Sequence, residues 1–368
     1  MSEPIVRFSD VDIVFGDKPK SALPLIDAGR SRAEIQRETG QVLGVAGCSL
    51  DVHEGEIVVL MGLSGSGKST LLRAVNGLNP VVRGQAQVRM ADGSWADPHA
   101  VSRRRLRRLR QERVAMVFQQ FGLLPWRTVR DNVAFGMEIA GLGRAERYAK
   151  VDEQLELVGL EGWADRQVGE LSGGMQQRVG LARAFATDAP ILLMDEPFSA
   201  LDPLIRDKLQ DDLLELQARL KRTIVFVSHD LDEALKLGNR IAIMEGGRIV
   251  QVGTAREIVT SPKTDYVREF VGSIDRQGVL TVADVMTAEP APLERPRPRE
   301  AVRLAASGYL DAQGRELKRF VFVCAPPQTA VARAIGVINR TGLPLLVEDE
   351  GGIVGTVTAE DVVRALER

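Results

Sequence analysis

A nine-residue stretch, GLSGSGKST at positions 62–70, constrains the fold of this chain more than any other feature. It fits the pattern Gly-x4-Gly-Lys-Ser/Thr, and it lies between an apolar run, 56–61, and a segment that we expect to be helical, 69–77. The glycines let the backbone curl so that its N–H groups converge on phosphate oxygens, and a helix N-terminus adds the positive end of its dipole. We therefore expect a strand, a phosphate-binding loop and a helix in succession.

The side chains of this loop predict its ligands. Lys68 is expected to reach the β- and γ-phosphates of a nucleotide, and Ser69 to ligate Mg2+. The strand and helix on either side disfavour the alternative, a glycine-rich turn with a chance Lys-Ser pair. The residues expected to bind the nucleotide here are Gly62, Ser64, Gly65, Ser66, Gly67, Lys68, Ser69 and Thr70.

A second motif, ILLMDEP at 191–197, is an apolar strand that ends in two acids. Open α/β sheets bind ligands at the carboxyl ends of their strands, so Asp195 and Glu196 are expected at the site. Asp195 suits the Mg2+ shell, and Glu196 suits polarising an attacking water. Taken alone, the pair could equally be two solvated acids at the start of a turn.

The third motif is LSGGMQQRVGLARA at 171–184. Ser172, Gly173 and Gly174 precede a helical run, so backbone N–H groups face outward at a second helix start. The alternative is an ordinary serine N-cap. The sequence alone does not say whether both helix starts meet on one nucleotide.

Apolar runs and helical stretches alternate along this part of the chain, which predicts an α/β fold with a parallel sheet. A polar helix closed by Gly40 is expected between the first two strands, and a turn at Gly246-Gly247 between the last two. The expected strands are 5–15, 42–52, 56–61, 190–194, 223–228 and the pair within 240–252, and the expected helices are 31–40 and 204–220.

Charge and cysteine content exclude several classes of protein. The chain has 48 Lys and Arg against 50 Asp and Glu, whereas a protein that wraps nucleic acid is usually strongly basic. Its two cysteines, Cys48 and Cys324, give neither a disulfide framework nor a metal-ligand spacing. The longest apolar stretches fall far short of the ~18 residues that a membrane span needs, so no transmembrane segment is expected.

The three motifs, in this order and spacing, resemble the ATP-binding subunit of an ABC transporter over residues 1–272. This resemblance implies a P-loop NTPase (RecA-like) core with an antiparallel β subdomain and a helical subdomain. We expect this ATP-binding domain to occupy residues 1–275. ATP and Mg2+ are the implied cofactors, and hydrolysis of ATP the implied reaction.

The resemblance also implies roles for residues outside the three motifs. Phe15 matches the aromatic residue that stacks on adenine, although a core phenylalanine is the alternative. Gln119 matches the glutamine that links Mg2+ and water to the transporter contact. Asp202 matches a loop acid that crosses the dimer. His229 matches the switch histidine that touches the γ-phosphate, although a histidine after a strand is usually structural.

Family members work as head-to-tail dimers, which implies a homodimer here. Each ATP would lie between Lys68 of one copy and Ser172–Gly174 of the other, so that two copies close over two ATP molecules. Closure then moves a membrane partner. In this scheme Glu196 is the base or the group that orients water.

An insert of ~25 residues after Phe15, which includes SRAEIQRETGQVLGV, resembles the importers of glycine betaine, proline betaine and choline. The segment FGLLPWRTVRDNVAFG, 121–136, looks most like the choline-type members. This likeness implies a peripheral ATPase at the cytoplasmic face of the inner (plasma) membrane. Its partners would be membrane permease subunits and an extracytoplasmic substrate-binding protein, with choline first and glycine betaine or proline betaine next as cargo.

The last part of the chain, 276–368, is expected to form a separate domain. Residues 286–299 hold four of the 17 prolines, and few of them can be in regular helix. The segments TVADVMT, 281–287, and 342–366 resemble a CBS domain, an α+β regulatory module, with one good copy and one degenerate one. Thr358 and Asp361 match positions that contact ribose in nucleotide-binding members. A structural or dimerisation role without a ligand is the alternative.

Rival functions remain open at this stage. The same machinery could import a different amine or an amino acid, or the C-terminal domain could make the chain chiefly a sensor. A soluble ABC ATPase acting on nucleic acid or ribosomes is a further alternative, although the chain has one ATPase half and no heptad array. Residues 103–113 hold seven arginines, for which we favour a solvated amphipathic helix over a nucleic-acid or lipid patch.

Overall fold

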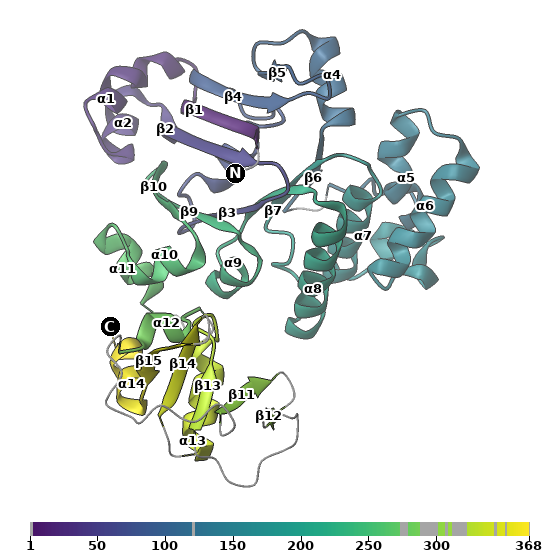
Figure 1. Ribbon diagram of the computed structural model, residues 1–368. Helices are drawn as coiled ribbons and strands as arrows, with labels where there is room; N and C mark the ends of the chain where they lie inside the picture. Colours follow the sequence, from purple (N-terminus) through teal and green to yellow (C-terminus); the bar gives the residue numbers. More distant parts are fainter. Residues whose placement is uncertain are drawn as a thin grey trace. The chain divides into compact units, whose positions relative to one another are not determined.

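A computed structural model describes residues 3–119, 122–272, 279–287, 301–305, 308–310, 322–341, 344–349 and 352–367 (Figure 1). The chain divides into two compact units, Met1–Val271 and Gly272–Arg368. Most of the proline-rich stretch, 288–299, lies outside the described residues. Within the described parts, no helix is both long enough and apolar enough to cross a membrane.

The core of the first unit is a six-stranded sheet in the order β10-β9-β3-β8-β7-β6. All neighbours are parallel except β9 and β10, which form a hairpin. β3, β7 and β8 are buried along their whole length, as expected for strands covered on both faces. The strands are β3 Ile57–Met61, β6 Val114–Val117, β7 Ile191–Asp195, β8 Thr223–Val227, β9 Arg240–Glu245 and β10 Arg248–Gly253.

Helices follow these strands and leave the connecting loops at the carboxyl ends of the sheet. The phosphate-binding loop follows β3, the acid pair ends β7, and His229 follows β8. α3 and α9 contact the sheet. The helices of this layer are α3 Lys68–Leu72, α8 Pro203–Leu220, α9 Leu231–Leu237, α10 Ala255–Thr260 and α11 Asp265–Val271.

The helix expected at 69–77 is shorter than predicted. α3 ends at Leu72, and the backbone continues with tighter i→i−3 hydrogen bonds from Ala74, Val75 and Gly77. Gly77 has a φ of 70°, a left-handed conformation that ends the segment.

A second, antiparallel sheet has the order β2-β1-β4-β5, and β1 pairs with both β2 and β4. The insert contributes short helices between β1 and β2. Its last helix, α2, starts in a capping box between Ser31 and Glu34 and ends at Gly40, whose φ is 69°. The elements are β1 Pro4–Phe15, β2 Val42–His53, β4 Arg83–Arg89, β5 Trp95–Ala96, a 3-10 helix Pro19–Ala22, α1 Leu23–Asp27 and α2 Arg32–Thr39.

Three helices form the expected helical subdomain, in which α5, α6 and α7 contact one another in pairs (Figure 1). α4 precedes β6 and is amphipathic, with Leu109 buried and its arginines exposed. The structure therefore agrees with the solvated helix predicted for this arginine-rich segment. The elements are α4 Arg103–Glu112, α5 Val129–Ile139, α6 Arg144–Leu157 and α7 Gly173–Phe185, with 3-10 turns at Glu161–Trp163 and Val168–Glu170.

The second unit is an α/β module whose sheet has the order β12-β11-β13-β14-β15. β13 lies parallel to β11 and β14, and β15 returns antiparallel to β14. Its own core is formed by aliphatic side chains from the helices and from β14 and β15. The elements are α12 Val282–Val285, β11 Ala301–Ala305, β12 Gly308–Leu310, β13 Phe322–Ala325, α13 Val331–Thr341, β14 Leu345–Asp349, β15 Gly352–Val357 and α14 Ala359–Glu367.

A buried carboxylate, Asp12, holds the antiparallel sheet to the insert. Asp12 is fully buried on β1, and its carboxylate accepts hydrogen bonds from the Gly47 N–H, at 2.7 Å, and from the Arg83 guanidinium. Arg83 also donates to Asp27, at 2.7 and 3.0 Å, at the exposed end of α1. One arginine therefore joins a buried carboxylate to an exposed one.

Asp12→Ala is expected to lower the free energy of unfolding by about 2 kcal/mol, because it leaves a buried N–H and a guanidinium without their acceptor. Asp27→Ala is the matched control and should have little effect, because that end of the ion pair is solvated. Urea denaturation of both variants makes the comparison. Equal losses in the two variants would contradict this account of the sheet.

Candidate nucleotide-binding site

A hollow of about 320 Å³ opens at the carboxyl ends of the central strands. It gathers most of the predicted nucleotide-binding residues from β1, the phosphate-binding loop, the glutamine loop after β6 and the end of β7. The hollow is lined by Phe15, Arg32, Val42, Leu43, Gly44, Ser64, Gly65, Gly67, Lys68, Ser69, Thr70, Gln119 and Glu196.

The phosphate-binding loop has the backbone that its glycines predict. Gly62, Gly65 and Gly67 have φ values of 140°, 78° and 102°, which L-residues rarely adopt. Space is limiting as well: a Cβ at position 62 would lie 2.1 Å from the Met244 carbonyl oxygen. The Oγ of Ser66 is buried and has no hydrogen-bond partner among the described residues. The loop is thus a curled cradle that contains an unsatisfied polar atom.

Lys68 lies in this cradle and is 5 % exposed. Its ammonium group donates to the carbonyl oxygens of Gly62, at 2.8 Å, and Leu63, at 3.0 Å. Burial lowers its pKa, and the charges of Glu196 and Asp195 oppose that shift. A phosphate would replace two neutral acceptors with a charged one, which makes a stronger hydrogen bond.

Asp195, at the end of β7, is fully buried and tied to α3. Its carboxylate accepts from the Ser69 hydroxyl, at 2.6 Å, and from the Arg73 guanidinium, at 2.8 and 3.2 Å. A hydroxyl oxygen beside a carboxylate oxygen fits Mg2+, which uses few protein ligands when it also binds phosphates. The described residues hold no cluster of three or more His, Cys, Asp or Glu that could bind a metal ion.

Glu196 has strained backbone geometry and two polar neighbours. Its φ is 50°, which is unusual for a side chain other than glycine and recurs at functional sites. One carboxylate oxygen accepts from Gln119 Nε2 at 3.1 Å and lies 3.4 Å from His229 Nδ1. The structure therefore brings together three residues that are 33 to 110 positions apart, on the loops after β6, β7 and β8.

Gln177 was missed by the sequence analysis, and it holds the backbone at Glu196. This buried side chain of α7 donates to the Glu196 carbonyl, at 3.2 Å, and accepts from the Ala200 N–H, at 3.1 Å. The helix that follows Ser172 is thus bonded directly to the acid-bearing loop. The only available signal was a glutamine within an otherwise apolar helical face.

Phe15 lies at the rim of the hollow, 37 % exposed, which suits a ring that stacks on a base rather than a core phenylalanine. Gly44 gives it room, because a Cβ there would lie 2.9 Å from a Phe15 ring carbon.

Eight predicted site residues are not among those that line the hollow, namely Gly62, Ser66, Asp195, His229, Ser172, Gly173, Gly174 and Asp202. The last four of these lie at the starts of helices. Ser172 caps α7 and accepts from the Met175 N–H, at 3.4 Å, with Gly173 and Gly174 following it. Asp202 caps α8 and accepts from the Ile205 N–H, at 3.1 Å. Within one chain these residues only start helices, so a nucleotide contact from them requires another copy.

In the second unit, Thr358 and Asp361 bond to each other. The Thr358 hydroxyl and N–H both donate to one Asp361 oxygen, at 2.7 and 2.9 Å, and the Asp361 N–H donates back to the Thr358 hydroxyl, at 3.1 Å. These bonds form a capping box at the start of α14. Burial would raise the pKa of Asp361, but the hydrogen bonds from Thr358 and Thr287 hold it below its usual range.

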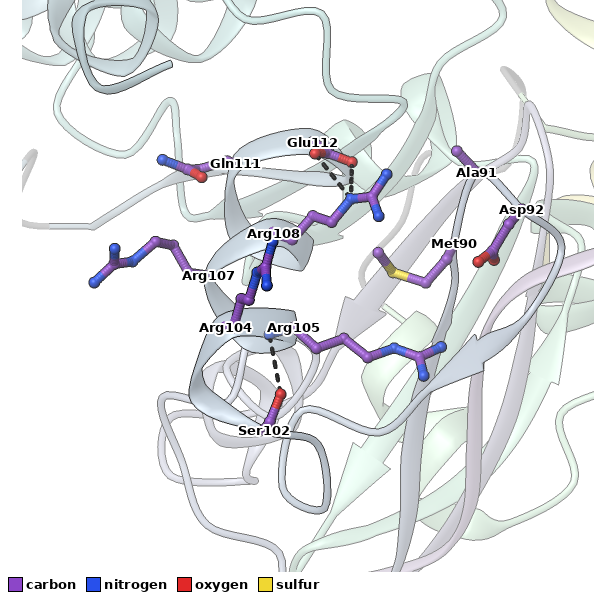
Figure 2. Close-up of a pocket in the computed structure, with 10 residues that line it drawn as sticks. All are labelled: Met90, Ala91, Asp92, Ser102, Arg104, Arg105, Arg107, Arg108, Gln111 and Glu112. Carbon is purple, nitrogen blue, oxygen red and sulfur yellow. Dashed lines mark hydrogen bonds and ion pairs between the residues drawn. The ribbon is translucent and has the colours of Figure 1, made fainter. Parts of the chain in front are cut away.

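A larger hollow, about 710 Å³, lies beside α4 and contains none of the predicted site residues (Figure 2). Four arginines of α4 line it. Arg108 pairs with Glu112, at 2.8 Å, and Arg105 donates to Ser94, at 2.8 Å. Among the described residues, the side chains of Arg104 and Arg107 form no hydrogen bond or ion pair. The hollow is the solvated side of a basic helix.

A buried polar cluster connects the loops after β7 and β8. Glu233 of α9 accepts from the Ser228 hydroxyl, at 2.5 Å, and from Gln210 of α8, at 3.0 Å. Arg206 of α8 pairs with Asp230, at 3.1 Å. The pKa of Glu233 is raised, mainly because the carboxyl group is buried. The hydrogen bonds from Ser228 and Gln210 lower this pKa, whereas the negative charge of Asp230 raises it. The helix that Asp202 starts is therefore bonded to the segment that carries His229.

Comparison with known families supports this arrangement. The ABC transporter family model matches residues 45–199, and the CBS domain model matches residues 315–368.

Two relatives extend the likeness over more of the chain. The glycine betaine/proline betaine transport system ATP-binding protein ProV of Salmonella typhimurium is 50 % identical over 295 residues, 79 % of this chain and 72 % of ProV. The glycine betaine/carnitine transport ATP-binding protein GbuA of Listeria monocytogenes is 39 % identical over 393 aligned positions, 98 % of this chain and 97 % of GbuA.

A solved structure is similar to this chain in sequence and fold. It is the dimeric post-hydrolysis state of the ATP-binding cassette MJ0796 bound to ADP and Pi, with 28 % identity and a TM-score of 0.59. The match covers 68 % of this chain and 99 % of the cassette.

Glu233→Gln is expected to change stability in a pH-dependent way. A raised pKa means that the folded state binds the proton more tightly than the unfolded state, so this contribution to stability is present at low pH and is lost as pH rises above 4.5, the ordinary value. The glutamine variant does not titrate. Its free energy of unfolding relative to the wild type should therefore rise as the pH increases above 4.5 in urea denaturation. A difference that is constant with pH would contradict the burial of an ionisable group here.

Proposed function

The chain belongs to the family of ATP-binding subunits of the ABC import systems for glycine betaine and proline betaine, and we propose that it hydrolyses ATP to drive import of a quaternary amine. The observation that carries the proposal is the convergence of three loops on one hollow. They supply a phosphate cradle with Lys68 and the hydroxyl–carboxylate pair Ser69 and Asp195. They also supply the Glu196 carboxylate, which lies beside Gln119 and beside His229 from the loop after β8.

In the proposed reaction, ATP and water give ADP and phosphate. The N–H groups of the loop and the start of α3 bind the phosphate chain, and Lys68 leaves the carbonyls of Gly62 and Leu63 to bind the β- and γ-phosphates. Ser69 and Asp195 would hold Mg2+, which neutralises charge on the phosphates. Phe15 stacks on the adenine.

Glu196 accepts a hydrogen bond from the attacking water and orients it, as base or positioning group. Its strained backbone and its contact with Gln119 support this role, because both hold the carboxylate toward the hollow. Such a residue contributes about 10²–10⁴-fold to the rate. His229 lies 3.4 Å from that carboxylate and is the proposed contact to the γ-phosphate.

A homodimer completes the proposed site. The matching cassette is dimeric, and within one chain Ser172, Gly173, Gly174 and Asp202 lie outside the hollow. We assign them to the ATP of the other copy, where the exposed start of α7 presents its N–H groups to the γ-phosphate. Gln177 then gives the acid-bearing loop a direct bond to that helix.

The partners in the proposal are membrane permease subunits at the cytoplasmic face of the inner membrane and an extracytoplasmic substrate-binding protein. The relatives are named for glycine betaine, proline betaine and carnitine, all quaternary amines. Choline, the cargo favoured from the sequence, stays a prediction. No nucleic-acid partner is proposed.

For the C-terminal unit we propose a regulatory nucleotide near Thr358 and Asp361, supported by the CBS domain match. Both side chains already cap α14, so a bound nucleotide would have to share their hydrogen bonds. A fall in the number of adenine nucleotides bound per chain in Asp361→Ala, with Lys68 intact, reports on this unit.

Glu196→Gln is expected to bind ATP with wild-type affinity and to lower the hydrolysis rate by about 10²-fold or more. The amide keeps the shape and the Gln119 contact but cannot accept a proton. Phosphate release by the full chain measures turnover, and calorimetry measures binding. Normal turnover would exclude Glu196 as the group that activates water.

Lys68→Ala is expected to weaken ATP binding, because it removes the cation that faces the phosphates. The loss should be about tenfold or more, the usual worth of a charged hydrogen bond. Lys221, which lies outside the hollow, provides the matched control as Lys221→Ala. Unchanged affinity in the Lys68 variant would contradict the assignment of the cradle.

A further inference from the structure

Arg32 reaches the nucleotide hollow from an unexpected part of the chain. It is the first residue of α2, in the insert between β1 and β2, and it lines the hollow together with Phe15 and Lys68. From the sequence, this insert is expected to carry a polar helix and to mark the transporter branch, without contributing to the site. In the structure, the insert contributes a residue to the lining of the site.

The guanidinium lies against the backbone of the phosphate-binding loop. It donates to the carbonyl oxygen of Gly65 in the loop and to that of Gly44 on β2. A Cβ at Gly67 would lie 3.3 Å from Arg32 Nη2, and a Cβ at Gly247 would lie 2.9 Å from it. A side chain at either position would crowd the guanidinium where it now lies.

No carboxylate neutralises this cation. Among the described residues Arg32 forms no ion pair, and its Nε is buried without a partner. Burial lowers its pKa. Arg73, by contrast, pairs with the carboxylate of Asp195 at 2.8 Å. A half-buried guanidinium that meets only neutral carbonyls lacks an anion, and the anion that this hollow is built to receive is a phosphate chain.

We propose that Arg32 is a phosphate-binding residue of the ATP site, contributed by the insert. This inference rests on the proposed function and adds one residue to it. When nucleotide binds, the planar guanidinium exchanges neutral carbonyl acceptors for phosphate oxygens, which it matches with paired N–H groups. Because Arg32 starts α2, nucleotide occupancy would also fix the position of the insert.

The ribose is the competing occupant of this position. Gly44 lies between Phe15 and Thr70, since a Cβ there would be 2.9 Å from the Phe15 ring and 3.0 Å from the Thr70 methyl group. Arg32 therefore lies between the base and phosphate ends of the hollow. Its contact with Gly65, inside the loop itself, favours the phosphates.

The test compares three variants of the full chain, Arg32→Ala, Arg32→Lys and Arg37→Ala, by calorimetric titration with ADP and Mg2+. ADP is not turned over, so the titration measures binding alone. Arg37 lies on the same helix and is exposed, with no hydrogen bond or ion pair to any described residue, so it controls for the loss of one positive charge.

Arg32→Ala is expected to raise the Kd for ADP about tenfold. Arg32→Lys should recover about half of the lost affinity on a logarithmic scale, because lysine keeps the positive charge but lacks the paired N–H donors of the guanidinium. Arg37→Ala should match the wild type. The melting temperature without nucleotide should be similar in all three variants, whereas its rise on adding ADP should be smaller in Arg32→Ala.

An unchanged Kd in Arg32→Ala, in a chain whose wild type binds and hydrolyses ATP, overturns this inference alone. The inference is also overturned if Arg32→Ala weakens binding of ADP but not of 2′,3′-dideoxy-ADP, because the lost contact is then to the ribose hydroxyls. A wild-type chain that binds no nucleotide overturns the proposed function and this inference together.

Discussion

The buried carboxylate of Asp195 is the interaction on which the rest of the site depends. It has no exposure to solvent, and its two oxygens are held by Ser69 and Arg73 at the two ends of α3. A buried charge of this kind is stable only while its partners are in place. Asp195 ends β7, and α3 follows the phosphate-binding loop. This one carboxylate therefore fixes the position of the loop relative to the strand that carries the acid pair.

Further hydrogen bonds connect the loops after β7 and β8 to neighbouring helices. Gln177 bonds the signature helix α7 to the backbone of Glu196, and the cluster at Glu233 bonds α8 to the segment that carries His229. Each of these helices starts with a residue assigned to the ATP of the other copy. In the proposed dimer, these bonds connect the loops beside the γ-phosphate to the two helix starts assigned to the other copy.

The local parts of the site could be predicted from the sequence, and the long-range parts could not. Positive-φ glycines, a capping box and a two-glycine turn depend on neighbouring residues, so the phosphate-binding loop, α2 and the β9–β10 hairpin came out as expected. Arg32 and Gln177 act through side-chain contacts with segments that are distant in sequence, and a single sequence does not show which distant segment a side chain contacts. The end of α3 at Leu72 was missed because helical propensity does not show where hydrogen bonds tighten.

The site and the relatives together identify this chain as the ATPase of a membrane importer for quaternary amines. The most direct measurement is to tag the chain, solubilise its source membranes gently and identify the proteins that co-purify. The account predicts a polytopic permease together with a substrate-binding protein that binds glycine betaine, proline betaine or choline when titrated. Recovery only from the soluble fraction, with nucleic acid or ribosomes, would contradict the transport assignment and leave only the nucleotide site.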